Sequence, residues 1–366
     1  MSTFRLEHAV PHTLARPLVI AIALMLATPT FAADFIIVDG QTETSQGVLN
    51  GAANNTAIIE AGGTLTVGSD AISATGTGNT ITNSGAITGD ASGIYSTGTK
   101  AIITNSGSIT GTNFDSIRSD GDDAIITNSG TIKAPIDDGI DSNGANAIIT
   151  NSGTITGGDS GIEIGSTGIN TIITNSGSIT GDANGIESNG ANAIITNSGS
   201  ITGTSFDGIN SIGAKATITN SGNITGADDG IDSRGANAII TNSGSITGGD
   251  DGIFSNGADA TITNTISGTI DADYGIYSQG TNVTITNSGT INATGDGIAS
   301  LGDDATITNS GIINGAYGIY SVGTNTIINN SGTITGTSYA VRDGTNDSLT
   351  LNLLKGSQLM GKIDLR

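Results

Sequence analysis

The sequence has no cysteine and no tryptophan, and its 366 residues include only 2 histidines, 3% aromatic side chains and 12% charged side chains. The absence of cysteine excludes disulfides, thiolate metal sites and cysteine nucleophiles. The scarcity of large side chains argues against an ordinary globular domain packed around aromatic residues. Glycine, by contrast, occurs 57 times. Any core must therefore be built from small aliphatic side chains.

The first 32 residues have the three-part pattern of a secretory signal peptide. Arg5 and Arg16 precede the apolar run "LVIAIALMLA", and the short polar segment "TPTFA" follows it. We expect cleavage after Ala32, with Thr30 at the −3 position. The run has ten residues, too few for a transmembrane helix. The pattern therefore predicts export.

Cleavage at this site would remove both histidines, His8 and His12. The exported chain would then contain serine without a histidine to activate it, which argues against Ser–His catalysis. The whole sequence is strongly acidic, with a formal net charge of −22. Such a surface repels nucleic acid and anionic lipid, so we expect no nucleic-acid partner.

Most of the remaining sequence is a repeat. The eleven residues "AIITNSGSITG" begin without change at Ala101, Ala193 and Ala238. The asparagine of "TNSG" recurs at spacings of 21 to 24 residues, and a period in this range indicates a repeat architecture. The twelve anchor positions are Asn83, Asn105, Asn128, Asn151, Asn175, Asn197, Asn220, Asn242, Asn264, Asn287, Asn309 and Asn330.

Three branched apolar positions accompany each anchor asparagine. Isoleucine lies two residues before it, as at Ile81 and Ile328, and in eleven repeats also four residues after it, as at Ile87. A third column runs from Ile94 to Val341. The alternation around the first column has period two, which is typical of a strand. Frequent glycines and β-branched residues disfavour helix.

These strands predict an all-β fold, a right-handed parallel β-helix (β-solenoid) of about twelve coils with 21–24 residues each. Stacking is required because one coil cannot cover its own apolar ends. We assign residues 33–78 to an N-terminal β cap, 79–342 to the β-helix repeats and 343–366 to an incomplete C-terminal coil. The anchor asparagines share the inward parity of the isoleucines, so we predict an internal ladder of side-chain amides.

Aspartates recur just before the third apolar column. Asp207, Asp229 and Asp251 occupy three consecutive repeats, and Asp228 and Asp250 lie beside two of them. We interpret the row as a solvated acidic face that keeps the protein soluble. One alternative is a weak calcium site formed by Asp207, Asp229 and Asp251, and no other cofactor is expected. A second alternative, a glycosidase carboxylate pair, lacks a neighbouring aromatic cluster that would bind sugar.

The order of these motifs resembles the passenger regions of bacterial autotransporters. A signal peptide is followed by rungs of "ITNSGSITG" alternating with "DGI.S.G" segments, and by "SLTLNLLKGSQLMGKIDL" near the end. The resemblance covers nearly all of the exported chain and implies display at the outer membrane by a C-terminal β-barrel translocator. The sequence stops at Arg366 before any such barrel, so we expect a fragment or truncated product that lacks it.

We therefore expect a non-enzymatic surface passenger, a stalk or adhesin-like rod that is displayed on a bacterial cell or secreted. Its partners would be molecules of a host or neighbouring cell surface, and the outer-membrane assembly machinery if a barrel exists. Two alternatives stay open. One is a β-helix carbohydrate-active enzyme. The other is an ice-binding or other secreted solenoid, because outward threonines such as Thr217, Thr261, Thr284 and Thr306 form a column that could order water.

Overall fold

The structure, a computed structural model, describes residues 34–49, 53–345 and 349–365. The predicted signal peptide lies outside these residues. Every regular element in the described ranges is a β-strand. None of these segments forms a helix of the length and apolarity that crossing a membrane requires.

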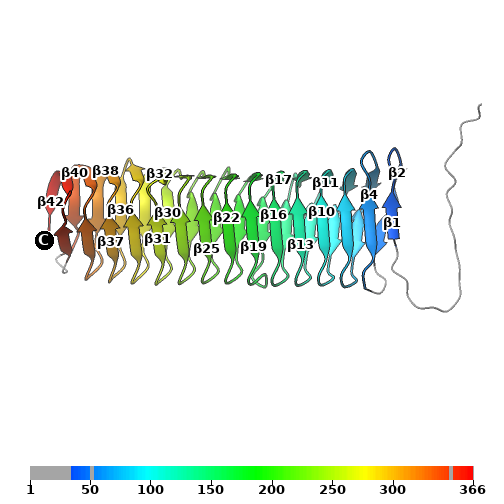
Figure 1. The fold of residues 1–366 in the computed structure, drawn as a ribbon, viewed down its shortest axis with the longest axis horizontal. Coiled ribbons are helices and arrows are strands. Elements are labelled where there is room, and N and C mark those ends of the chain that lie inside the picture. The colour runs from blue at the N-terminus through cyan, green and yellow to red at the C-terminus, as the bar shows by residue number, and fades with distance from the viewer. Residues whose placement is uncertain (1–33, 50–52, 346–348, 366) are drawn as a thin grey trace, which may run out of the picture. The chain divides into compact units, whose positions relative to one another are not determined.

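The first strand of each coil belongs to a parallel sheet of 15 strands (Figure 1). Each strand pairs with the equivalent strand one coil before and one coil after it, as β10 does with β7 and β13. The strands are β1 (Asp34–Ile37), β4 (Thr56–Ile59), β7 (Thr80–Asn83), β10 (Ile102–Asn105), β13 (Ile125–Asn128), β16 (Ile148–Asn151), β19 (Ile172–Asn175), β22 (Ile194–Asn197), β25 (Thr217–Asn220), β28 (Ile239–Asn242), β31 (Thr261–Asn264), β34 (Thr284–Asn287), β37 (Thr306–Asn309), β39 (Ile327–Asn330) and β41 (Thr350–Leu353).

The second and third strands of the coils form a sheet of 27 strands. The second strands are β2 (Thr42–Glu43), β5 (Thr64–Val67), β8 (Ala86–Gly89), β11 (Ser108–Gly111), β14 (Thr131–Lys133), β17 (Thr154–Gly157), β20 (Ser178–Gly181), β23 (Ser200–Gly203), β26 (Asn223–Gly226), β29 (Ser245–Thr247), β32 (Thr269–Ala272) and β35 (Thr290–Ala293). The third strands are β3 (Gly47–Leu49), β6 (Ile72–Ala74), β9 (Ile94–Ser96), β12 (Ile117–Ser119), β15 (Ile140–Ser142), β18 (Ile162–Ile164), β21 (Ile186–Ser188), β24 (Ile209–Ser211), β27 (Ile231–Ser233), β30 (Asp251–Ser255), β33 (Tyr274–Ser278) and β36 (Asp296–Ser300).

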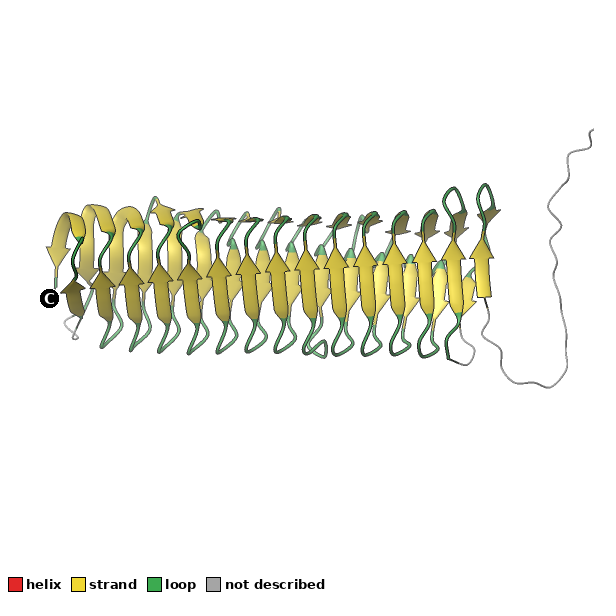
Figure 2. Ribbon diagram, viewed as in Figure 1, coloured by secondary structure: helices red, strands yellow, loops and turns green. Residues whose placement is uncertain are grey.

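The last three coils join their second and third strands into one. These joined strands are β38 (Ile312–Ser321), β40 (Thr333–Asp343) and β42 (Gln358–Asp364). Figure 2 shows the strand ribbon continuing through this corner at the C-terminal end, whereas a loop occupies it in most earlier coils. Chain length explains part of the change, because six positions separate Ile313 from Ile319, whereas eight separate Ile201 from Ile209. The shorter connection leaves fewer residues for a loop.

The chain is an all-β, right-handed parallel β-helix, and the predicted fold class is confirmed. The described residues form fifteen coils, whereas the anchor asparagines indicated about twelve. The additional coils lie at the two ends, where an apolar residue takes the place of the anchor. Ile59 pairs with Asn83, and Leu353 pairs with Asn330. A search for the anchor motif therefore misses these coils, although their register continues that of the repeats.

The three apolar columns form the core as predicted. In one representative coil Ile218 and Ile224 are 1% exposed and Ile231 is 0% exposed. Glycine lets neighbouring coils approach this closely at two points. A Cβ on Gly222 would lie 2.1 Å from the carbonyl oxygen of Gly199, and a Cβ on Gly230 would lie 2.4 Å from a methyl carbon of the next coil. These distances explain the glycines of the "NSG" and "DGI" motifs.

The predicted amide ladder is confirmed. Nδ2 of Asn220 donates to Oδ1 of Asn242 at 2.9 Å and also to the carbonyl oxygen of Ser245 at 3.0 Å. The same amide-to-amide bond links all twelve anchors, from Asn83 to Asn330, at 2.7 to 2.9 Å. The ladder satisfies buried polar groups at the corner between the first and second strands.

Candidate functional site

The corner between the second and third strands holds most of the charged and aromatic side chains that face one another. We call the positions two residues before the third apolar column the corner column. It contains mostly aspartate in the middle coils and tyrosine in several later ones. Its members are Asp70, Ser92, Asp115, Asp138, Ser160, Asn184, Asp207, Asp229, Asp251, Tyr274, Asp296, Tyr317 and Tyr339.

The middle aspartates of the corner column are buried. Their exposed fractions run from 3% at Asp115 and Asp138 to 9% at Asp229, with 5% at Asp207 and 6% at Asp251. The interpretation of this row as a solvated acidic face is therefore wrong. Hydrogen bonding is the physical reason, because these aspartates lie at the corner and their carboxylates accept backbone N–H groups of the next coil.

Several carboxylates of this column accept a hydrogen bond from the backbone of the next coil. Oδ1 of Asp207 accepts from the N–H of Asp229 at 3.1 Å, and Oδ1 of Asp229 accepts from the N–H of Asp251 at 3.0 Å. In earlier coils the N–H of Asp138 donates to Asp115 at 3.2 Å. These bonds satisfy buried backbone donors at the corner. The aspartates therefore have a structural role that requires no ligand.

Burial determines the protonation of this column. It raises the pKa of Asp207 to about 6 and the pKa of Asp229 to about 7, although each carboxylate accepts a backbone hydrogen bond that acts in the opposite direction. Burial, followed by the charge of Asp229, raises the pKa of Asp251 to about 8. The pKa of Asp115 is raised to about 7, again mainly by burial. Near neutral pH, part of the column therefore carries protons instead of charge.

The fold stacks the three aspartates of the predicted calcium row in consecutive coils. Oδ1 of Asp207 and Oδ1 of Asp229 each accept a backbone hydrogen bond, and Oδ2 of Asp207 also accepts one from Nδ2 of Asn210 at 3.0 Å, so an ion at this row would compete with existing donors. Within the described ranges, a closer grouping of carboxylates lies elsewhere: oxygen atoms of Asp115, Asp137 and Asp138 all lie within 4.8 Å of one another. Sequence reasoning did not pair Asp137 with its neighbours as metal ligands.

A second column, the outer column, lies on the outward face of the third strands. It contains the residue that follows each third-column isoleucine, and strand pairing stacks its members coil by coil. It is acidic in the middle coils and aromatic or cationic towards both ends. Its members are Tyr95, Arg118, Asp141, Glu163, Glu187, Asn210, Asp232, Phe254, Tyr277, Ala299, Tyr320 and Arg342.

Arginine side chains cover aromatic rings towards both ends of the outer column. The guanidinium carbon of Arg118 lies 5.9 Å from the ring centroid of Tyr95. That of Arg234 lies 5.8 Å from the centroid of Phe254, and Arg234 is also paired with Asp232 at 2.6 Å. Both arrangements are cation–π contacts. Aromatic rings of the outer column therefore bind guanidinium groups that the chain itself supplies.

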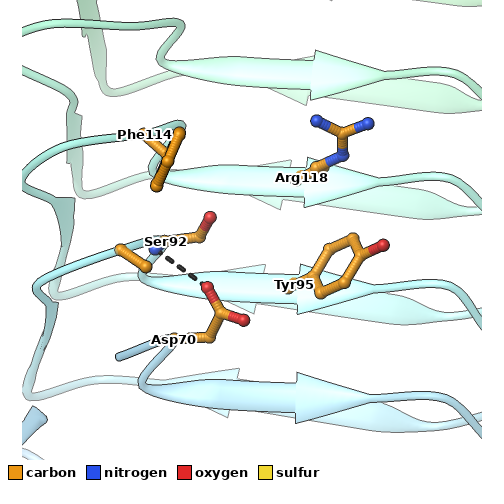
Figure 3. A pocket seen from close by; sticks show the side chains of 6 residues that line it. Asp70, Ser92, Tyr95, Phe114 and Arg118 are labelled. Carbon is orange, nitrogen blue, oxygen red and sulfur yellow. Dashed lines mark hydrogen bonds between the residues drawn. The ribbon is translucent and has the colours of Figure 1, made fainter. Parts of the chain in front are cut away.

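A cavity of about 310 Å³ opens beside Arg118 in the earlier coils (Figure 3). In Figure 3 the backbone N–H of Ser92 donates to Asp70 at 3.1 Å. The guanidinium of Arg118 lies 3.3 Å from Asp120 and 3.6 Å from Asp141, so its charge is balanced within the chain. The residues that line the cavity are Asp70, Ala91, Ser92, Tyr95, Phe114 and Arg118.

A second cavity, the Asp251 cavity, has a volume of about 300 Å³ and is lined by Asp250, Asp251, Phe254, Tyr274 and Tyr277. The rings of Phe254 and Tyr277 stack at 5.9 Å with an interplanar angle of 13°, and Tyr274 meets Tyr277 edge to face at 5.7 Å. Two carboxylates and three rings thus surround one space. This overturns the premise that no aromatic cluster accompanies an acidic pair.

Sequence reasoning missed the burial of the aspartates and the aromatic clusters, although two signals were available. Aspartate recurs at one fixed position before the third-column isoleucine, which indicates a role within the coil and not a free surface charge. Aligning the repeats on that isoleucine places Phe254 and Tyr277 in one column and Tyr274 beside them. The neighbours of a side chain in this fold are therefore found from the pairing register between coils, and not from its position along the chain alone.

Comparison of the chain with protein-family models, with curated proteins and with solved structures finds no match. The parallel β-solenoid is the part of the resemblance to autotransporter passengers that the structure bears out. A proposal about function must therefore be argued from the repeat, the coil register and the two cavities.

Proposed function

We propose that this chain is a non-enzymatic exported passenger, a rod that is displayed on a bacterial surface or released from it. The main support is the regularity of the first sheet. From β4 to β39 every strand pairs four residues with the four equivalent residues of the next coil. A column of identical coils holds its two ends a fixed distance apart and repeats its surface groups every ~4.8 Å. That design suits a spacer or multivalent weak adhesion.

The export part of the proposal is supported by the N-terminal pattern, and the autotransporter part by the repeat motifs. An antibody raised against the purified solenoid tests both on intact cells of the organism that encodes it. Labelling of intact cells that external protease removes, or a secreted chain that begins at Ala33, is the expected result. A chain found only inside cells, with residues 1–32 still attached, would contradict the proposal.

A carbohydrate-active enzyme is the second candidate, because the Asp251 cavity places two carboxylates beside aromatic rings that could stack on a sugar. The pKa of Asp251, raised to about 8 by burial, leaves a protonated carboxyl of the kind that a general acid requires. A screen of the purified chain against neutral and acidic polysaccharides tests this candidate. Turnover that Asp251→Asn abolishes would establish it, and no turnover on any polysaccharide would remove it.

A further inference from the structure

We propose that the Asp251 cavity binds an organic cation, the guanidinium group of an arginine side chain presented by a partner protein. The first argument is the chemistry of its walls. Phe254, Tyr274 and Tyr277 offer the negative faces of aromatic rings, and the two tyrosines also offer hydroxyls. Asp250 and Asp251 offer carboxyl oxygens, and a bound cation would favour the charged form of Asp251. Aromatic rings combined with carboxylates are the surroundings in which a guanidinium is held by cation–π contacts and by charge-assisted hydrogen bonds.

The second argument is a buried acceptor that has no donor. Asp251 is only 6% exposed, and its Oδ1 has no hydrogen-bond partner in the described part of the chain. In the two preceding coils the equivalent oxygens, on Asp207 and Asp229, each accept the backbone N–H of the next coil. Leaving a buried acceptor unpaired carries a desolvation cost. A ligand that donates a hydrogen bond to this oxygen would remove that cost.

The shorter connection of the following coil explains why the donor is missing. Six positions separate Ile270 from Ile276, one fewer than separate Ile246 from Ile253. Consequently the N–H of Tyr274 donates to the backbone carbonyl of Asp250 at 2.8 Å. The row of carboxylate-to-backbone bonds therefore ends at Asp251, which lines this cavity.

The third argument is a second aromatic cluster in which the chain supplies the cation. The guanidinium carbon of Arg342 lies 5.3 Å from the ring centroid of Tyr317, 5.7 Å from that of Tyr320 and 5.5 Å from that of Tyr339. Its Nη1 also donates to the hydroxyl of Tyr317 at 3.0 Å. The geometry shows that tyrosines at these register positions accommodate a guanidinium.

Register identifies what differs between the two clusters. Arg342 pairs with Tyr320 across neighbouring coils, and at the equivalent place Ala299 pairs with Tyr277. No lysine or arginine of the described chain lies over the rings of Tyr274 or Tyr277. Arg234 lies over the third ring, Phe254, and is paired with Asp232. The rings of Tyr274 and Tyr277 in the Asp251 cavity thus lie beside two acidic side chains without a cation from the described chain. This inference does not depend on export, because it uses the folded chain alone.

The test uses N-acetylarginine amide as the probe and N-acetylcitrulline amide as its uncharged isostere, with binding to the purified chain followed by calorimetry. We expect saturable binding of the arginine probe and at least tenfold weaker binding of the citrulline probe. Asp251→Asn should weaken arginine binding at least tenfold. Asp207→Asn is the matched control, since Asp207 is equally buried in the same column but lies outside the cavity, and it should leave the affinity within twofold.

A second variant keeps the proposal testable if Asp251→Asn fails to fold. Tyr277→Leu removes one ring of the cavity at a half-buried position, so it should weaken binding of the arginine probe at least tenfold. Equal affinity for the two probes, equal loss in Asp207→Asn and Asp251→Asn, or unchanged binding in Tyr277→Leu would each overturn the proposal. So would binding of calcium chloride by this cavity without binding of the arginine probe, which would make it a metal site.

Discussion

Two buried polar columns run through this solenoid at different corners. The amide column contains Asn220 and its equivalents between the first and second strands, and the carboxylate column contains Asp229 and its neighbours between the second and third strands. Asn220 both accepts and donates within its column, at 2.8 Å from Asn197 and 2.9 Å to Asn242. Asp229 only accepts, and its partner is a backbone N–H. The amide is self-complementary, whereas the carboxylate depends on a donor from outside its column.

This difference accounts for how far each column extends. The amide column continues unbroken from Asn83 to Asn330, since every new coil brings both a donor and an acceptor. The carboxylate column is interrupted by Ser160 and Asn184. Its run of hydrogen bonds from backbone N–H groups stops at Asp251, because in the shorter next coil the N–H of Tyr274 donates to the carbonyl of Asp250 instead. The amides do not titrate, whereas burial raises the pKa values of the carboxyls.

The largest expected effect comes from placing a carboxylate in the amide column. Asn220→Asp cannot donate to Asn242 or to the carbonyl of Ser245, and it buries a charge with no cation nearby. We expect a loss of about 3–5 kcal/mol in the free energy of unfolding, measured by chemical denaturation followed by circular dichroism. Ser221→Asp, at the next and exposed position, is the control and should change it by less than about 0.5 kcal/mol. Similar losses in both variants would show that the amide column is not essential.

The second prediction uses the titration of the carboxylate column. In the unfolded chain these aspartates have ordinary pKa values near ~4, whereas the folded-state pKa values are about 6 for Asp207, about 7 for Asp229 and about 8 for Asp251. The folded state therefore binds more protons between these limits, and stability should rise as the pH falls from about 8 to about 5. We expect the melting temperature to increase on the order of 5 °C over this range. A melting temperature that falls on acidification to pH ~5 would contradict the buried, raised-pKa assignment.

The third prediction makes the carboxylate column resemble the amide column at one position. In Asp229→Asn the side-chain oxygen can still accept the N–H of Asp251, but the buried charge beside Asp207 is gone. We expect stability at pH ~8 to rise by about 1 kcal/mol and the gain to disappear near pH ~5, where the wild-type carboxyl is protonated. Thermal melts at both pH values measure this. A gain that is equal at the two pH values would assign it to packing and not to charge.

The smallest expected effect is that of calcium on the carboxylate column. An ion that binds the folded state more tightly than the unfolded state must stabilise it. Millimolar calcium should therefore raise the melting temperature by about 1–2 °C, if either the row containing Asp229 or the cluster of Asp115, Asp137 and Asp138 binds it. Asp229→Asn and Asp137→Asn tell the two sites apart. The same rise with sodium chloride at matched ionic strength would leave only charge screening.

Parts of this structure follow from single repeats. The inward position of Ile218 follows from the alternation along β25, and the inward position of Asn220 follows from the same alternation. The burial of Asp229 does not follow from alternation, because Asp229 lies in the corner before β27 and its carboxylate accepts the N–H of Asp251 in the next coil. Aspartate is usually solvent-exposed, so the sequence predicted an exposed acidic face. The end coils were missed because Ile59 and Leu353 replace the anchor asparagine.

The sequence by itself determined the all-β class, the coil period, the apolar columns and the amide ladder. The reason is that the repeat period and the alternation of inward and outward side chains are local properties, and both can be seen in every repeat. Only the tertiary structure decided which oxygen of Asp251 lacks a donor and which rings surround it. Both depend on the length of the next coil and on its register, so residues more than twenty positions apart become neighbours. The Asp251 cavity arises because adjacent coils differ in length. It cannot be predicted from one coil, since each repeat taken alone fits the same sequence pattern.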